Sequence, residues 1–442
     1  MKRLLLIICL ISIAFGAHAD RVKVRLFSNN SIDQINISFD LGTYNLYSND
    51  TSIIEAEMGA GRSVELTPTA GKVHVTIDGY DYGTHSNISF IANDTACILC
   101  LNPRKLKHRT YEGNLLVSVN RNGKLLLIND VEFETYIAGV VQSEIYGDKS
   151  DIFRVQAIIS RTWALKNIRK HASEGYNFCD QVHCQAYLNR CVRPDIMLGT
   201  MQSSGMTIVD ENGQLIETPF HANSGGETAN SEDVWRSAVP YLRSVPDTFS
   251  YHMKQSEWVK VLTEDKWLNY FSSKHKIDTT NDSIRNELLS FSQSTRKKRI
   301  CGIPLTRIRN DFQLRSTFFS VLYDSSSHRI TLSGHGFGHG VGLSQEGTIR
   351  MVNLGISYDS IIRHYYSGAL IHYDENHPKN YVENYVKQIS RIIEEDKSST
   401  TRIKSKQDDW LGRLFRIRDR EEREEVYDPR NDELDSDWQY DW

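Results

Sequence analysis

Apolar and polar side chains alternate along much of the stretch from residue 21 to residue 129, the pattern of half-buried β-strands. Residues 22–26 read Val-Lys-Val-Arg-Leu, and residues 73–77 read Val-His-Val-Thr-Ile. Clusters of turn-forming residues, such as Ser-Asn-Asp at 48–50, separate the runs. The pattern predicts β-structure from the start of this stretch to its end.

The period changes after a hairpin at residues 115–128, whose Asn122-Gly123 pair can supply the positive φ that a tight turn needs. From Val131 to Gln142 the apolar residues follow helical spacing, at positions 133, 136, 137, 140 and 141. Ser150 can cap a second helix that continues through Ile168. Glu144 therefore lies where one helix ends and the next has not begun.

Residues 205–246 return to strands and loops, and about 250–315 are more polar with a helical pattern, which indicates an insertion. A glycine-rich run at 334–342 follows, and short helices are predicted after Ser344 and from Tyr358. The whole pattern predicts an α+β fold that is rich in strands, with a short helical segment that carries Glu144.

The first 19 residues have the features of a secretory signal peptide. Lys2 and Arg3 precede an apolar run over residues 4–15, and Ala-His-Ala at 17–19 forms a small-x-small cleavage signal before Asp20. The apolar run is too short to span a membrane, and the rest of the chain contains no apolar stretch of spanning length. The sequence thus predicts an exported protein, periplasmic or extracellular, without a transmembrane span in its mature part.

Composition is that of a globular protein, with 39% hydrophobic and 24% charged residues among 442. The formal net charge of −4 argues against nucleic acid as a partner. Beyond about residue 373 the chain becomes strongly charged, typical of a solvated helix or disorder. We therefore divide the chain into a signal peptide (1–19), a β-rich region (20–110), a main domain (111–372) and a charged tail (373–442).

Two cysteines and two histidines lie close together in the sequence. Cys179, His183 and Cys184 fall within six residues, His171 precedes them and Cys191 follows. Two thiolates and two imidazoles form a typical zinc ligand set. Because an exported chain can form disulfides, a Cys179–Cys184 or Cys184–Cys191 bond is the alternative. A second pair, at positions 97 and 100, has no nearby histidine and predicts a disulfide or two core thiols.

Several separated blocks resemble the SpoIID/LytB family. In chain order they are residues 132–144, 156–165, 183–187, 224–235 with 240–245, 338–345, and 364–368. They are spread in this order over about residues 110–370, and the resemblance covers neither the tail, nor the insertion, nor much of the first hundred residues. Two departures stand out: Trp163 replaces an expected tyrosine, and Ile145-Tyr146 replaces an expected Met-Pro after Glu144.

The resemblance implies a peptidoglycan lytic transglycosylase with Glu144 as its single general acid and base. Such an enzyme cleaves between N-acetylmuramic acid and N-acetylglucosamine, leaves 1,6-anhydromuramic ends, and in sporulation members acts on strands stripped of stem peptides. The acid must hold its proton near neutral pH. Val140, Val141 and Ile145 offer an apolar flank, and a helix C-terminus disfavours ionisation. A solvated surface glutamate is the competing interpretation.

The resemblance also implies contacts with the glycan. The expected residues are Arg161, Ser224, Gly225, Gly226, His339, Ser344 and Gln345. Missing side chains at glycines let a sugar approach closely. The competing roles are a helix-surface arginine for Arg161 and a turn residue for Ser224. Glu227, Glu232 and Asp233 are candidates for a second carboxylate.

For the cysteine and histidine group, the resemblance implies a structural zinc held by Cys179, His183 and Cys184, with His171 as fourth ligand. Two other functions compete with the transglycosylase. The first is a non-catalytic peptidoglycan-binding amidase enhancer, whose partner would be an N-acetylmuramoyl-L-alanine amidase. The second is a zinc hydrolase, which is disfavoured because two thiolates suit a closed site.

Overall fold

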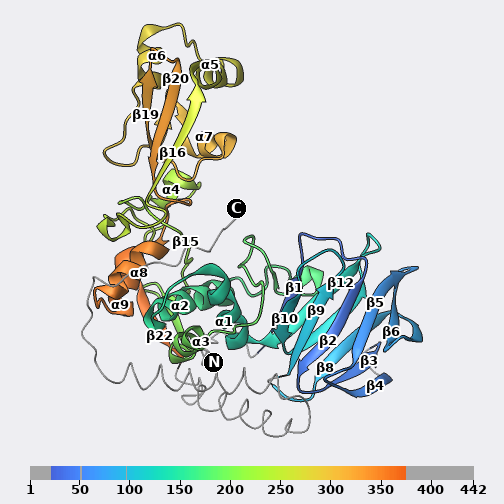
Figure 1. Ribbon diagram of the computed structural model, residues 1–442. Coiled ribbons are helices and arrows are strands. Elements are labelled where there is room, and N and C mark those ends of the chain that lie inside the picture. Colours follow the sequence, from blue (N-terminus) through green and yellow to red (C-terminus); the bar gives the residue numbers. More distant parts are fainter. Residues whose placement is uncertain (1–20, 50–51, 96, 375–442) are drawn as a thin grey trace, which may run out of the picture.

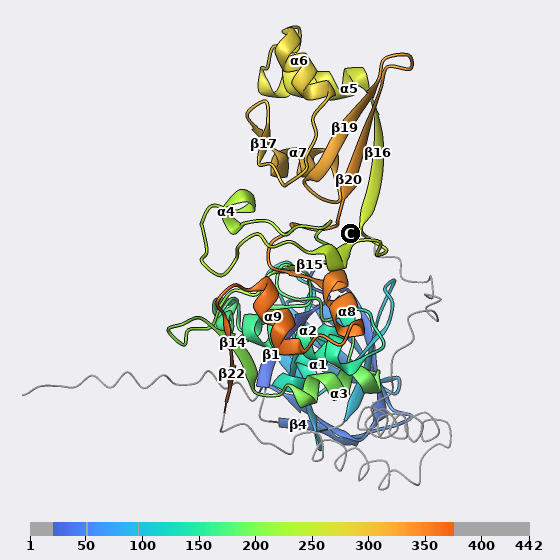
Figure 2. The same ribbon diagram turned by 90° about the vertical axis from the view of Figure 1, so that its left-hand side faces the viewer.

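The computed structural model describes residues 21–49, 52–95 and 97–374 (Figure 1). The predicted signal peptide and, apart from residues 373 and 374, the predicted charged tail lie outside the described residues. The predicted α+β, strand-rich fold is confirmed. Two sheets lie on one side of the molecule, helices pack beside them, and a separate arm projects from the helical part (Figures 1 and 2).

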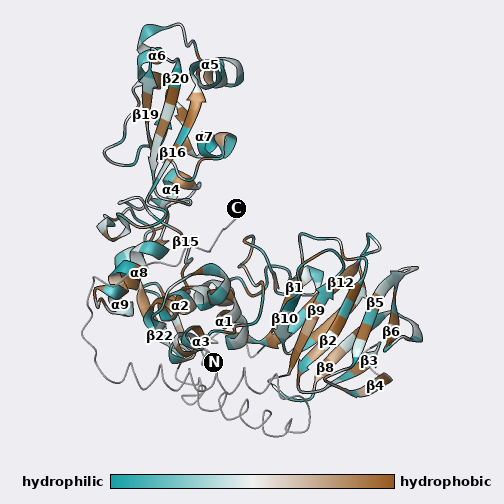
Figure 3. Ribbon diagram, in the orientation of Figure 1, coloured by the Kyte–Doolittle hydropathy of each residue, from teal (hydrophilic) through white to brown (hydrophobic). Residues whose placement is uncertain are grey.

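The two large sheets share one hydrophobic core. The first sheet runs in the order β13 (Phe178–Cys179), β1 (Arg21–Leu26), β12 (Leu125–Glu132), β11 (Asn114–Val119), β8 (Asn87–Ala92), β3 (Tyr44–Ser48) and β4 (Ser52–Met58). The second runs in the order β10 (Arg109–Glu112), β9 (Ile98–Pro103), β2 (Ile35–Leu41), β5 (Ser63–Thr69), β6 (Lys72–Ile77) and β7 (Tyr80–His85). Buried and exposed residues alternate along β1 and β2, and Figure 3 shows the resulting apolar stripes.

The core continues from these sheets into the helices, from Val22 to Ala369. Residues on the two sides of the boundary predicted near residue 110 therefore share one core. The reason is strand pairing: β1 pairs over its whole length with residues 127–132 of β12, so the two predicted regions close a single sheet.

The helical layer consists of α1 (Phe133–Glu144), α2 (Ser150–Lys166), α3 (Pro194–Gln202), α8 (Gln345–Asn353) and α9 (Tyr358–Tyr365). The predicted hairpin forms as β11 and β12, and Gly123 in its turn has a φ of 71°. Helix α1 begins two residues later than predicted because β12 continues to Glu132, opposite Arg21. Lys149, not Ser150, occupies the N-cap position of α2.

Short strands and turns bring distant blocks together. The pairs are β14 (Met206–Val209) with β22 (Leu370–Tyr373), and β15 (Phe220–His221) with β21 (Leu343–Ser344). Between these strands in the chain lie α4 (Ser231–Val234) and the 3-10 turn η2 (Thr248–Ser250), while the 3-10 turn η1 (Ala172–Glu174) follows α2. Because β15 and β21 are parallel neighbours, the two glycine-rich blocks of the sequence meet beside the helical layer.

The arm has a hydrophobic core of its own, and Figure 2 shows it extending away from the sheets. Its sheet runs in the order β16 (Glu257–Thr263), β20 (Arg329–His335), β19 (Phe318–Asp324). The other elements are α5 (Glu264–Asn269), the π-helix η3 (Tyr270–Lys274), α6 (Asp282–Leu289), β17 (Arg299–Ile300), β18 (Ile303–Pro304) and α7 (Leu305–Phe312). The unit is thus wider than the predicted insertion at 250–315, because β16 pairs with a strand far along the sequence.

Among the described residues, every helix is too short or too polar to cross a lipid bilayer.

Candidate functional site

Glu144 is the last residue of α1, and its side chain is partly buried. Its Oε1 atom accepts a hydrogen bond of 2.8 Å from the backbone N–H of Ala186. Burial raises the pKa of this carboxyl to about 7, although the Ala186 hydrogen bond acts in the opposite direction. At neutral pH the group can therefore both donate and accept a proton, as general acid–base chemistry requires.

The loop that contains Ala186 packs tightly against the last turns of α1. A Cβ atom on Gly139 would lie 2.5 Å from the Tyr187 ring, so only glycine allows this approach. Gln142 donates to the Arg190 carbonyl at 3.0 Å and accepts from the Val192 N–H at 2.7 Å. These contacts fix the end of the helix, and with it the position of Glu144.

A second segment holds the other side of the Glu144 turn. Gln345 donates from Nε2 to the Glu144 carbonyl at 2.8 Å. The Tyr146 hydroxyl donates to Oε1 of Glu346 at 2.7 Å, and Asn223 donates to Oε2 of the same carboxyl at 2.7 Å. Ile145-Tyr146, the departure from the expected Met-Pro, thus supplies an anchor of its own. The sequence analysis did not identify Glu346. Its only signal in the sequence was its position directly after Gln345.

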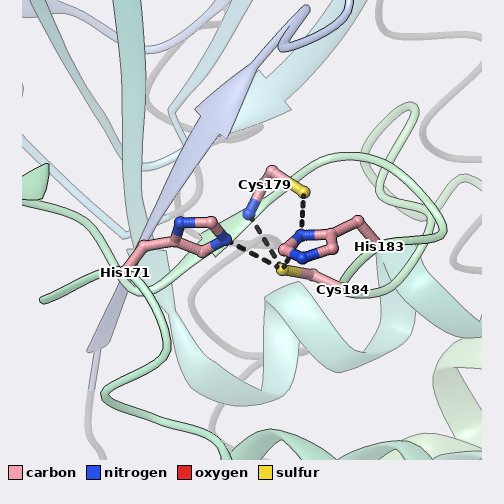
Figure 4. A group of neighbouring side chains, drawn as sticks. All are labelled: His171, Cys179, His183 and Cys184. Atoms are coloured by element: carbon pink, nitrogen blue, oxygen red, sulfur yellow. Dashed lines mark hydrogen bonds between the residues drawn. The ribbon is translucent and has the colours of Figure 1, made fainter.

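The four predicted metal ligands converge from separate turns, and Figure 4 shows their side chains directed toward one another. His171 Nε2 lies 3.4 Å from Cys184 Sγ, while His183 Nδ1 lies 3.7 Å from Cys179 Sγ and 3.8 Å from Cys184 Sγ. All four ligand atoms lie within 4.8 Å of one another. A tetrahedral ion with ~2.3 Å bonds to sulfur and ~2.0 Å bonds to nitrogen needs separations of roughly 3.3–3.8 Å. The geometry fits such an ion.

The surroundings of this cluster suit a metal site as well. His171 directs its other ring nitrogen to Oε1 of Glu174 at 2.5 Å, the carboxylate–histidine arrangement that orients metal ligands. A hydrogen bond from Cys184 lowers the pKa of Cys179, which favours the thiolate form that a metal ligand needs. All six cysteines in the described part of the chain are free thiols, so the alternative disulfides, including one between residues 97 and 100, are not formed.

Arg161 lies away from the carboxyl of Glu144. Its side chain is 1% exposed and forms a bidentate ion pair with Glu134, with distances of 2.7 and 2.6 Å. A further N–H donates to the Met206 carbonyl at 3.1 Å. The structure therefore corrects the predicted glycan contact: this arginine joins α1 and α2 to the strand β14, because a buried cation needs a buried counter-ion.

The Ser-Gly-Gly block directs its groups inward, which corrects its predicted glycan contacts. Ser224 is buried, and its hydroxyl donates to Asp247 at 2.7 Å. A Cβ atom at Gly225 would lie 2.7 Å from the His335 carbonyl carbon, and one at Gly226 would lie 2.3 Å from the Tyr251 ring. In the direction that a Cβ atom would take, the space beside both glycines is therefore occupied by protein atoms.

The second glycine-rich block behaves in the same way. His339 accepts from the Val341 N–H at 3.0 Å, and burial lowers its pKa to about 4, so the ring is neutral. Ser344 is buried and caps α8 by accepting from the Gly347 N–H. Of His339, Ser344 and Gln345, Gln345 is the one that forms a hydrogen bond with Glu144, through the Glu144 carbonyl.

The candidates for a second carboxylate are all held by protein partners. Glu232 pairs with Arg243, whose hydrogen bonds lower the pKa of Glu232 to about 2. Asp233 pairs with Lys298. Glu227 accepts from the Arg296 backbone N–H at 3.0 Å and from the Ser244 hydroxyl at 3.1 Å.

Comparison with known proteins agrees with this geometry. The family described as "SpoIID: Stage II sporulation protein" matches residues 121–207, the segment that contains Glu144 and the cysteine–histidine cluster. Over this segment the chain is similar to the SpoIID/LytB family. SpoIID-type relatives include Stage II sporulation protein D of Bacillus subtilis, 26% identical over 260 residues that cover 55% of this chain and 75% of the relative.

Two further relatives widen the comparison. An uncharacterized protein of Brachyspira hyodysenteriae is 26% identical over 59% of this chain and 71% of its own length. A protein named amidase enhancer, from Bacillus subtilis, is 25% identical over 53% of this chain, but the match spans only 40% of that relative. At the level of the family, these similarities support a cell-wall-related role for the chain.

Proposed function

We propose that the protein is a peptidoglycan lytic transglycosylase in which Glu144 serves as both general acid and general base. The observation that carries the proposal is the partly buried carboxyl at the end of α1, with a pKa raised to about 7. The acidic side chains at positions 227, 232 and 233 are bound to protein groups, so a single-carboxyl mechanism suits the site better than a two-carboxylate hydrolase.

The reaction needs two proton transfers at one group. The protonated Glu144 donates to the oxygen that links N-acetylmuramic acid to N-acetylglucosamine, and the glycosidic bond breaks. The resulting carboxylate then takes the proton of the muramyl C6 hydroxyl as that oxygen bonds to the anomeric carbon. The product is a 1,6-anhydromuramic end, no water is consumed, and Glu144 regains its proton. A pKa near neutrality suits both steps.

We further propose a structural zinc ion held by His171, Cys179, His183 and Cys184. Two thiolates and two imidazoles fill a tetrahedral shell, which favours a closed structural site over a hydrolytic one. Bound zinc would supply rigidity to the loop that continues from Cys184 to Ala186. Through the Ala186 N–H, this loop holds the Glu144 carboxyl at 2.8 Å.

One alternative has a specific observation in its favour. Because one relative is named amidase enhancer, the chain could bind peptidoglycan without cutting it and act together with an N-acetylmuramoyl-L-alanine amidase. The same partner fits the main proposal, since an amidase would supply strands free of stem peptides. Both functions place the protein outside the cell membrane, at the wall, as the predicted signal peptide requires.

The decisive experiment incubates the purified protein with intact and with amidase-treated peptidoglycan and measures 1,6-anhydromuramic ends by mass spectrometry. We expect anhydro ends, and a loss of about 100- to 10,000-fold in Glu144→Gln, as expected for removal of a general acid. Glu211→Gln, at an exposed carboxylate, is the matched control and should retain activity. Tight binding to the glycan with no anhydro ends in the wild type would instead establish the binding function.

A further inference from the structure

One of the contacts between the arm and the main body is made by an arginine side chain. Arg296 lies in the arm between α6 and β17, and its guanidinium reaches the Ser-Gly-Gly block of the body. We propose that Arg296 is a positioning residue, through which the arm holds the two glycine-rich loops that border the Glu144 turn. The inference rests on the proposed transglycosylase function and extends it to a residue outside the matched segment 121–207.

The guanidinium bridges the two carbonyls on either side of the glycine pair. Nη2 donates to the Ser224 carbonyl at 2.5 Å, and Nε donates to the Glu227 carbonyl at 2.6 Å. Gly225 and Gly226 have φ angles of 74° and 106°, a backbone shape that residues with side chains rarely adopt. The two N–H groups of Arg296 thus hold together the two ends of this short loop, because they bind the carbonyls of Ser224 and Glu227 at the same time.

The same guanidinium also contacts the second glycine-rich loop. A Cβ atom on Gly340 would lie 3.1 Å from the Cζ atom of Arg296, so the glycine leaves space for the cation. The ring of Phe318 in β19 lies 4.9 Å from the guanidinium carbon, and Nη1 donates to the Thr317 hydroxyl at 3.3 Å. Arg296 is therefore fixed by the arm on one side and contacts both loops on the other.

Hydrogen bonds continue from these loops to the candidate acid. Asn223, next to Ser224, donates to Glu346, and Glu346 also accepts from Tyr146, two residues after Glu144. Gln345 binds the Glu144 carbonyl directly. A shift of the loop at residue 224 would thus reach the Glu144 turn through two side-chain contacts.

Arginine is the residue type that this position requires. Its planar fork can donate to two carbonyls at once, whereas the lysine ammonium is a compact point charge. Arg296 opens a run of four basic residues, and the other three, 297–299, are exposed. A run of this kind usually forms a solvated surface, which is why sequence analysis assigns no role to its first member.

The test measures kcat and KM for formation of anhydro ends from amidase-treated peptidoglycan by the full-length protein. Arg296→Met keeps the apolar stem and removes the donors, and we expect kcat/KM to fall about 10- to 100-fold, mostly in kcat, as for a misplaced catalytic group. Arg296→Lys should recover only part of the loss. Arg299→Met is the matched control, since Arg299 donates only locally to the Gly302 carbonyl, and its kinetics should equal those of the wild type.

Two measurements keep the outcomes distinct. Thermal unfolding of Arg296→Met should stay near that of the wild type, while hydrogen exchange should become faster at residues 223–227 and 338–346. Wild-type kcat/KM in Arg296→Met would overturn the inference, as would a fall that only accompanies global unfolding. If the wild type forms no anhydro ends, the proposed function fails, and unchanged exchange at both loops would then refute the structural part independently.

Discussion

The two regions that flank Glu144 use their polar atoms in opposite ways. In residues 171–191, four ligand atoms face one another at separations that an ion would fill, and a backbone N–H is directed at the acid. In the region formed by residues 221–227 and 336–346, the serine, histidine and carboxylate groups bond mainly to protein partners. Both regions are rich in polar residues. The polar groups of residues 171–191 form a candidate binding site, whereas those of residues 221–227 and 336–346 form a scaffold.

The difference teaches how such sequence blocks should be interpreted. Cysteine and histidine within a few residues have few uses other than metal or disulfide, so their type already restricts their role. Serine and glycine are used in turns everywhere, and only the packing around them shows whether they face a ligand. Three experiments test whether the two regions differ in this way.

The largest effect is expected at the cluster. Cys184→Ser should lose bound zinc, measured by metal analysis of the purified protein, and reduce formation of anhydro ends by roughly 100-fold, because the Ala186 N–H loses its fixed position. Cys191→Ser is the control, since Cys191 is buried with its thiol directed to the Arg193 carbonyl, away from the cluster. Zinc retained at wild-type content in Cys184→Ser would contradict the proposed ligand set.

A smaller effect of a different kind is expected in the scaffold. Ser224→Ala removes a donor to the buried Asp247 carboxyl, to which the Tyr365 hydroxyl also donates at 3.0 Å. The free energy of unfolding should fall by about 1–3 kcal/mol in denaturant titrations, with KM for the glycan nearly unchanged. A large rise in KM without loss of stability would show that Ser224 contacts substrate after all.

The pH dependence of activity and of stability tests the raised pKa of Glu144, which lies between the two regions. Because Glu144 must carry a proton to start the reaction, kcat/KM should fall about tenfold per pH unit above its pKa of about 7. The folded pKa exceeds the ordinary value of 4.5, so folded protein binds the proton more tightly, and stability declines as pH rises from 4.5 through 7. Glu144→Gln should therefore unfold at higher temperature than the wild type at pH 8, and at nearly the same temperature at pH 4. If Glu144→Gln and the wild type unfold at equal temperatures at pH 8 as well as at pH 4, the pKa of Glu144 is not raised.

Local patterns predicted the elements around the acid well. The hairpin, the change to helical period and the position of Glu144 at a helix end follow from residue spacing, because each involves contacts between near neighbours in sequence. The convergence of residues 171–184 was also predictable, since three of the four ligands lie within six residues. The position of His171 was the weaker expectation, and η1 brings it to the cluster.

Non-local contacts account for the predictions that were wrong. Arg161 has the spacing of an ordinary helical arginine, and only the fold brings Glu134 to it from the preceding helix. Ser224 acquires Asp247 as a partner across a loop, and the arm includes β20 because that strand pairs with β16. None of these pairings leaves a periodic signal, so a single sequence cannot indicate them.

The position of β1 has a consequence for how the chain reaches this structure. Residues 21–26 lie between β12 and β13, so the first described strand is completed only when residues 125–132 and 178–179 have joined it. Contacts of such long range slow the approach to the native state. A nascent chain that ends before Phe178 would retain an open strand edge on β1, and such an edge invites pairing between molecules. The cluster that begins beside β13 would thus form only after residues 178–184 have been made, and the Ala186 N–H could hold the acid no earlier than that.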